Sequence, residues 1–118
     1  MTYALNLPTD PTSVGLKACA IQTSPTQDIV KVGEAGEAGA QGAVIFDNGS
    51  GTPQARTFIL GNTTPIPDAF VGPFTAPTSG SATITVTLTT PTLGSQKITL
   101  TFPANSPSHS DCTLGSSP

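Results

Sequence analysis

Charged side chains are scarce in this chain. Asp, Glu, Lys and Arg make up 9% of its 118 residues, against about 25% in a typical soluble domain. Four residues are cationic, and they lie far apart in the sequence: Lys17, Lys31, Arg56 and Lys97. Proteins that bind nucleic acid rely on clustered Lys and Arg side chains to contact phosphates. We therefore expect no nucleic-acid partner.

Long apolar runs are missing as well. A membrane-spanning helix needs about 18 or more consecutive apolar residues, and no such stretch occurs here. Residues 1–8 have neither the basic segment nor the apolar core of a secretory signal. We expect no membrane association, and synthesis in a cytoplasm.

Aromatic residues are few, with no Trp, one Tyr and five Phe. Leu, Ile, Val and Phe together form roughly a fifth of the chain, which is close to the level of disordered proteins. Disorder also requires a high net charge, and here the net charge is only −3. We therefore expect one folded domain with a thin hydrophobic core. Such a domain would gain from burying further surface in a homo-oligomer.

The chain has two cysteines, Cys19 and Cys112. Cys19 lies in an apolar run and is predicted to be a core residue, whereas Cys112 lies in a polar segment. A disulfide between them would close a long loop and add about 4 kcal/mol of stability in the chain-entropy model. Two free thiols, as expected in a reducing compartment, are the alternative. The sequence leaves both open.

Twelve glycines and twelve prolines leave little room for helices. Short strands separated by turns are typical of an all-β fold, here a single-domain antiparallel sandwich or barrel. The clearest strands span residues 81–89 and 96–102, joined by a turn with Pro91 and Gly94. In both strands apolar residues alternate with threonines, which places the threonines outward. These outward residues are Thr83, Thr85, Thr87, Thr89, Thr99 and Thr101.

Further strands are predicted over residues 14–22 and 27–32, with a hairpin of 43–47 and 56–60. Residues 61–81 contain four prolines around Ala69–Val71 and are predicted to be an extended edge or an excursion. Residues 33–42 repeat glycine at every third position and are predicted to be a flexible surface loop, or a polyproline II segment at a subunit contact. The predicted organisation is an N-terminal arm (1–13), a β domain (14–102) and a polar Pro/Ser-rich tail (103–118).

The sequence contains no constellation typical of an active site. His109 is the single histidine, and its neighbours Ser108 and Asp111 lie in the predicted tail, whereas a catalytic triad is assembled on a rigid scaffold. One His and two distant Cys cannot supply the four ligands of a structural zinc site. Glu34 and Glu37 lie on a glycine-rich segment that fixes no separation between them. We predict no enzyme, no catalytic residues, no cofactor and no metal.

Two weaker patterns also have simple explanations. Residues 47–51 are rich in oxygen ligands, but they lack the later acidic residue of a calcium loop, so a turn is predicted. The outward threonines are similar to the Thr-x-Thr surfaces of ice-binding proteins. Those proteins repeat the array over many coils, whereas a single hairpin should twist. Threonine is also simply a good strand former.

The chain is short, signal-free, β-rich and poor in charge, with extended ends at residues 1–13 and 103–118. In this it resembles the head decoration or cement proteins of tailed bacteriophages; the likeness covers composition and architecture, and no family motif maps to particular positions. The resemblance implies a non-enzymatic virion structural protein that binds and stabilises a capsid lattice. It also implies a homo-oligomer such as a trimer, other capsid or tail subunits as partners, and localisation to the virion. The alternative is a β-sandwich adhesion or ligand-binding module of a fibre, tail or cell surface.

Overall fold

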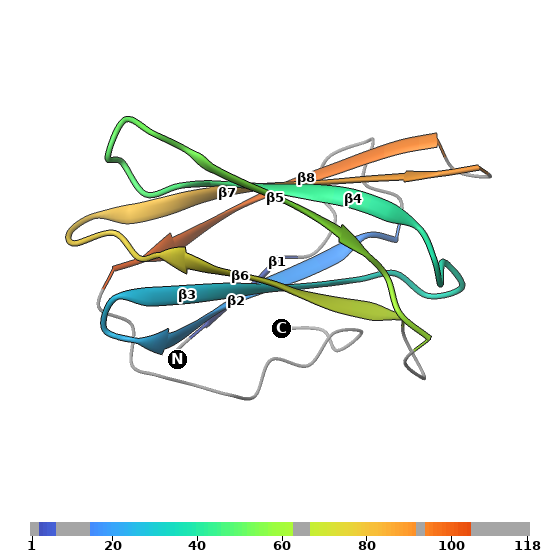
Figure 1. Ribbon diagram of the computed structural model, residues 1–118, viewed down its shortest axis with the longest axis horizontal. Coiled ribbons are helices and arrows are strands. Elements are labelled where there is room, and N and C mark those ends of the chain that lie inside the picture. The colour runs from blue at the N-terminus through green and yellow to red at the C-terminus, as the bar shows by residue number, and fades with distance from the viewer. Residues whose placement is uncertain (1–2, 7–14, 63–66, 92–93, 105–118) are drawn as a thin grey trace.

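Eight antiparallel strands form two stacked sheets in the computed structural model, which describes residues 3–6, 15–62, 67–91 and 94–104 (Figure 1). The strands are β1 (Tyr3–Asn6), β2 (Lys17–Ser24), β3 (Gln27–Gly33), β4 (Gln41–Asp47), β5 (Gln54–Ile59), β6 (Asp68–Thr75), β7 (Ser81–Thr90) and β8 (Gly94–Pro103). The first sheet has the order β1-β2-β3-β6 and the second the order β5-β4-β7-β8. The described ranges contain no helix, and the predicted all-β sandwich is confirmed.

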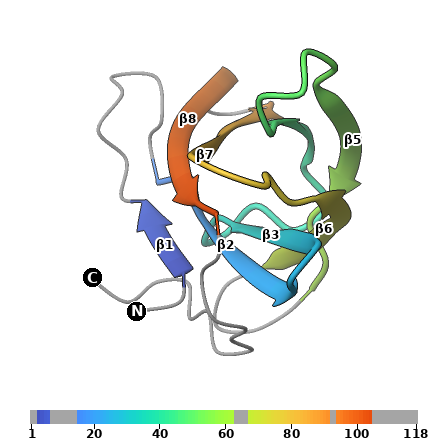
Figure 2. The ribbon, with the colours of Figure 1, turned by 90° about the vertical axis from the view of Figure 1, so that its left-hand side faces the viewer.

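The two sheets approach each other at both margins without merging into one barrel. Figure 2 shows β1 beside β8 at one margin and β5 beside β6 at the other. Side chains of β5 bridge the second margin to the β6 backbone. The Arg56 guanidinium donates to the Pro73 carbonyl at 3.3 Å, and the Thr75 N–H donates to Gln54 Oε1 at 3.1 Å. In a continuous sheet, backbone hydrogen bonds between β5 and β6 would take the place of these side-chain bonds.

The β7–β8 hairpin has the structure that its alternating sequence predicts. The strands pair without a break from Ser81 opposite Pro103 to Thr90 opposite Gly94. Gly94 has a φ of 71°, a backbone conformation that favours glycine at the end of the turn. The apolar residues of both strands are buried: Ala82, Ile84, Val86, Leu88, Ile98, Leu100 and Phe102. The threonines between them face outward, as predicted.

The hydrophobic core lies between the two sheets. The rings of Phe46 in β4 and Phe74 in β6 stack with centroids 4.7 Å apart, and so join the second sheet to the first. Other buried residues of the same cluster come from both sheets and from the segments beside them: Leu16, Ala18, Ala20, Val30, Val32, Val44, Phe58, Leu60 and Val71. Side chains of one sheet therefore pack on those of the other, as expected for a sandwich of this size.

Three further segments form strands in the structure. Residues 3–6, inside the predicted arm, form β1 and pair with β2. The strand predicted at 14–22 is observed at Lys17–Ser24, and the proline-rich segment around residues 69–71 forms the edge strand β6. Residues 7–14 and 105–118 lie outside the described residues, and with them most of the predicted tail.

The glycine-repeating segment after β3 makes two tight turns. The Glu37 N–H donates to the Glu34 carbonyl at 3.3 Å, and the Ala40 N–H donates to the Glu37 carbonyl at 3.1 Å. The Gly39 N–H donates to the Leu60 carbonyl at 2.8 Å. The segment therefore carries the chain from the first sheet to the second as a pair of turns held to Leu60, the residue after β5. The sequence predicted a flexible surface loop or a polyproline II segment at a subunit contact.

Candidate functional site

The described residues form surface features more clearly than a reactive centre. In the ranges 15–62, 67–91 and 94–104, no three His, Cys, Asp or Glu side chains lie close enough to hold a metal ion. His109 falls outside those ranges. No helix in the same part of the chain is long and apolar enough to cross a membrane.

Cys19, the first of the two cysteines of the chain, is fully buried in the middle of β2. Its neighbours Ala18 and Ala20 belong to the core cluster between the sheets. Because side chains alternate along a strand, Cys19 lies on the opposite face of the first sheet, away from that core. Its predicted burial is confirmed. Cys112 lies outside the described residues, so the pairing of the two cysteines stays a prediction.

The outer face of the second sheet is a broad polar surface that four strands form. We call it the threonine face. Cross-strand pairing sets Thr83 opposite Thr101 and Thr85 opposite Thr99. Besides Ser81 at the start of β7, the alternation of buried and outward positions assigns fifteen residues to this face: Gln41, Ala43, Ile45, Asp47, Ala55, Thr57, Ile59, Thr83, Thr85, Thr87, Thr89, Ser95, Lys97, Thr99 and Thr101.

The threonine face is nearly free of charge. Asp47 and Lys97 are the only ionisable residues among the fifteen described positions. Hydroxyl groups bond within the face at its middle and at one end: Thr87 Oγ1 donates to the Ala43 carbonyl at 3.5 Å, and the hydroxyls of Thr89 and Ser95 are 3.4 Å apart. Depletion of charge is characteristic of the buried centre of protein interfaces. The face therefore suits broad contact with another protein.

Two large apolar side chains are exposed at the margin where β5 lies beside β6. Ile59 of β5 is 61% exposed and Phe70 of β6 is 62% exposed. The Lys31 ammonium lies 5.3 Å from the centre of the Phe70 ring and 3.4 Å from Asp68 Oδ2, so this ring packs beside an ion pair. Ile59 also belongs to the threonine face, which extends the apolar part of that face to the sheet margin.

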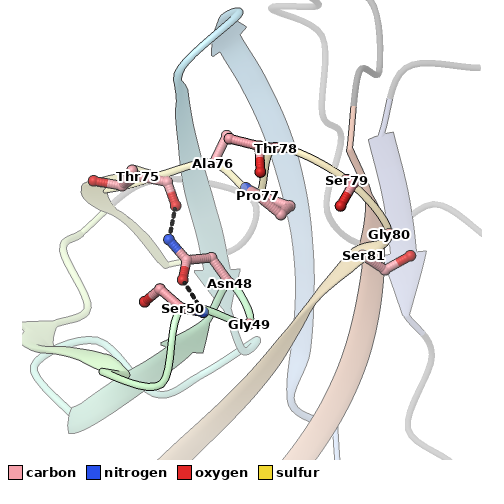
Figure 3. Close-up of a pocket in the computed structure, with 10 residues that line it drawn as sticks. All are labelled: Asn48, Gly49, Ser50, Thr75, Ala76, Pro77, Thr78, Ser79, Gly80 and Ser81. Carbon is pink, nitrogen blue, oxygen red and sulfur yellow. Dashed lines mark hydrogen bonds between the residues drawn. The ribbon is translucent and has the colours of Figure 1, made fainter.

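A groove of about 450 Å³ opens at one end of the sandwich, between the β4–β5 and β6–β7 loops (Figure 3). We call it the loop groove. Asn48 ties the two loops together, because its Nδ2 donates to the Thr75 carbonyl at 3.0 Å. The same side chain accepts from the Ser50 N–H at 3.0 Å. The described lining of the loop groove is Asn48, Gly49, Ser50, Thr75, Ala76, Pro77, Thr78, Ser79, Gly80 and Ser81.

The loop groove offers neutral hydrogen-bonding groups. The lining includes the hydroxyls of Thr78, Ser79 and Ser81, which make no hydrogen bond to the described part of the protein. None of its ten described lining residues is charged or aromatic. The turn predicted at residues 47–51 is confirmed, since Asp47 Oδ1 accepts from the Gly49 N–H at 2.9 Å. That carboxylate thus shapes the loop.

The structure buries two carboxyl groups whose burial was not predicted from the sequence. Asp28 is 1% exposed and Glu34 is 3% exposed, and each has one oxygen without a hydrogen-bond partner in the described structure. Burial raises the pKa of Asp28 to about 6, and it also raises the pKa of Glu34. The burial of Asp28 was predictable from the sequence, because Val30 and Val32 follow it at every second position and share the inner face of β3. The burial of Glu34 was not predictable, because its glycine-rich neighbours show no alternation of apolar and polar residues.

No known protein family, curated protein or solved structure matches this chain.

Proposed function

We propose that this protein is a non-enzymatic structural protein of a virus particle, which decorates and stabilises a phage capsid lattice by binding neighbouring structural subunits. The threonine face is the observation that supports this proposal most directly. It is an exposed face of a four-stranded sheet, it mixes methyl and hydroxyl groups, and it holds one acidic and one basic residue. Such a face can be covered by another protein with little loss of charge hydration.

The source of binding free energy follows from this composition. Burying apolar surface contributes roughly 25 cal/mol per Å², and the threonine methyls, Ala43, Ile45 and Ile59 would supply it. Hydroxyls must exchange bonds with water for bonds across the interface, which is close to neutral when the geometry is good. Charge attraction contributes little, so the association should respond weakly to salt.

We expect the native mass of the protein to exceed that of one chain, or a structural subunit to copurify with it in stoichiometric amount, and this association to persist in about 1 M NaCl. Thr85→Lys, which puts a cation in the middle of the threonine face, should weaken the association at least tenfold because the charge must be desolvated. Sedimentation velocity at several protein concentrations measures both effects.

The matched control is Thr52→Lys, which adds the same charge at an exposed residue of the β4–β5 loop, outside the threonine face. It should leave the sedimentation profile unchanged. Dissociation in high salt, equal effects of the two lysine variants, or a lone monomer at every concentration would each contradict the proposal.

The loop groove favours a second candidate function, a β-sandwich module that binds a neutral polyhydroxylated ligand such as a glycan. Its available hydroxyls are suitable, but its described lining has no aromatic ring for stacking, so we expect dissociation constants no tighter than about 1 mM. Titration with neutral oligosaccharides, followed by amide chemical shifts, should then perturb residues 75–81. Ser79→Phe should block the binding, whereas Thr23→Phe, exposed on β2, should not. The absence of saturable shifts would rule this function out.

A further inference from the structure

A small cavity lies at the end of the sandwich opposite the loop groove, where the chain leaves β3. Its volume is about 190 Å³, and its described lining is Gly15, Lys17, Glu34 and Ala35. Glu34 is held firmly by its backbone: its N–H donates to the Pro67 carbonyl at 3.2 Å, and its carbonyl accepts from the Glu37 N–H at 3.3 Å. These two hydrogen bonds fix the backbone from which the carboxyl group extends.

The Glu34 carboxyl has hydrogen-bonding capacity that the described structure leaves unused. The residue is 3% exposed, and its Oε1 has no hydrogen-bond partner there. An ionised carboxylate can accept about four hydrogen bonds. Leaving it buried without a compensating charge is costly. A cationic donor at this position would remove that cost.

A second unused acceptor lies beside the first. Gln96 of β8 is 1% exposed, and in the described structure neither its Oε1 nor its Nε2 completes a hydrogen bond. The amide is nonetheless close enough to Glu34 to lower the pKa of that carboxyl against the effect of burial. The Gln96 side chain therefore interacts with the carboxyl group, and the buried acceptors that still lack a partner in the described structure are Glu34 Oε1 and Gln96 Oε1.

The opening to the carboxylate depends on a glycine. A Cβ atom added at Gly15 would lie 3.0 Å from Glu34 Oε2, and the φ of +77° further disfavours a side chain there. Gly15 thus leaves one face of the carboxylate open toward the cavity. Its position satisfies both the turn before β2 and access to Glu34.

We infer that this cavity binds a primary ammonium group, with the Glu34 carboxylate as counter-ion and Gln96 Oε1 as an additional acceptor. An ammonium has one positive charge and three N–H donors, which matches these acceptors. A calcium ion would need six to eight oxygen ligands, and the described residues provide no cluster of three acidic or metal-binding groups. The ammonium is therefore the better fit.

Two charged residues near Glu34, Glu37 and Lys17, have opposite effects on the binding of an ammonium group. Glu37 raises the pKa of Glu34 by repulsion between the carboxylates, and the same negative charge attracts a cation to the cavity. Lys17 lines the cavity, but no ion pair joins it to Glu34 in the described structure. Its like charge should weaken the binding of an ammonium. Because burial raises the pKa of Glu34 and binding needs the ionised carboxylate, affinity should fall on acidification.

The ammonium can come from two sources: a lysine side chain of the structural subunit bound in the lattice, or a free small amine. The first source rests on the proposed function, and the second does not. Both would present the same chemical group to Glu34. Ligand binding measured together with the oligomeric state of the protein distinguishes them.

The test is an amide chemical-shift titration of the full chain at pH 7 and constant ionic strength. The ligands are n-butylammonium, Nα-acetyl-lysine amide and, as a cation without N–H donors, tetramethylammonium. We expect saturable shifts of Gly15, Glu34 and Ala35 with the two primary ammonium ligands and none with tetramethylammonium. Glu34→Gln should weaken binding at least tenfold while the spectrum stays dispersed, and Lys17→Met should strengthen it.

The wild-type titration decides the question even where a variant does not fold. Absence of saturable shifts in the wild type, or equal response to tetramethylammonium, would overturn the inference. If the ammonium ligands fail while the salt-resistant association persists, only this inference is wrong. If they bind and the protein remains a lone monomer, the site is confirmed for a free amine and the proposed function fails.

Discussion

Asp28→Asn is expected to raise the free energy of unfolding by about 3 kcal/mol at pH 8 and to leave it nearly unchanged near pH 4. Asp28 is 1% exposed, its Oδ1 has no hydrogen-bond partner in the described structure, and burial raises its pKa from 3.8 to about 6. Each pKa unit corresponds to about 1.4 kcal/mol, so the difference of roughly two units corresponds to about 3 kcal/mol.

The direction of this pH dependence follows from proton binding. Between about pH 4 and pH 6 the folded state holds a proton on Asp28 that the unfolded chain has released, so stability falls as pH rises through this interval. The stabilisation is fully present below about pH 4 and lost above about pH 6. An Asn residue has no proton to release, and the variant should lack this dependence.

The neighbour of Asp28 supports the same result. Gln22 faces Asp28 across the β2–β3 pair, is buried, and has an Oε1 without a partner in the described structure. An ionised Asp28 adds a second acceptor beside it, whereas Asn adds an N–H donor that can serve Gln22. Supplying a donor to a buried acceptor commonly contributes about 1 kcal/mol.

Urea unfolding at intervals from pH 4 to pH 8 measures the effect. Asp47→Asn is the matched control, because the Asp47 carboxyl lies at a strand end and already accepts from the Gly49 N–H. An asparagine Oδ1 can accept the same bond, so this variant should show no gain at pH 8. A wild-type stability that stays constant between pH 4 and pH 7, or equal gains from both variants, would show that Asp28 is not the source.

The strands were predictable where local pattern and tertiary burial agree. In the β7–β8 hairpin, Ile84 and Val86 alternate with threonine, and Pro91 and Gly94 supply the turn, so sequence alone defined both strands. β6 was recognisable as an edge because Pro73 cannot donate to a neighbouring strand. The pairing of β4 with β7 and of β3 with β6 was not predictable, since it depends on contacts between residues distant in the chain.

The candidate sites were less accessible to sequence reasoning, for a related reason. The threonine face followed from alternation, but its extension over Ile45 and Ile59 required the order of strands in the second sheet. The surroundings of the Glu34 carboxyl include Gln96 of β8, which lies far from Glu34 in the sequence and reaches it only in the folded chain. A glutamate in a glycine-rich segment has no local signal of burial.

Gly42→Ala is expected to lower the free energy of unfolding by about 3 kcal/mol or more. Gly42 lies on the inner side of β4, opposite Phe58 in β5 and Leu88 in β7. A Cβ at Gly42 would collide with the Phe58 ring and with the backbone carbonyl of Thr87. The ring can rotate, but the carbonyl belongs to the β7 backbone and can move only by distorting the β4–β7 pairing. The absent side chain therefore provides the space in which Phe58 packs.

Chemical denaturation can separate this packing effect from a general intolerance of alanine. Gly49→Ala is the control: a Cβ there meets nothing within 4 Å, although the φ of +85° is unfavourable for alanine, so its cost should be about 1 kcal/mol. Phe58→Leu should recover part of the loss when combined with Gly42→Ala, because the smaller side chain removes one of the two collisions. The remaining loss then reports the collision with the Thr87 carbonyl. A Gly42→Ala variant as stable as Gly49→Ala would contradict this account of the close approach between β4, β5 and β7.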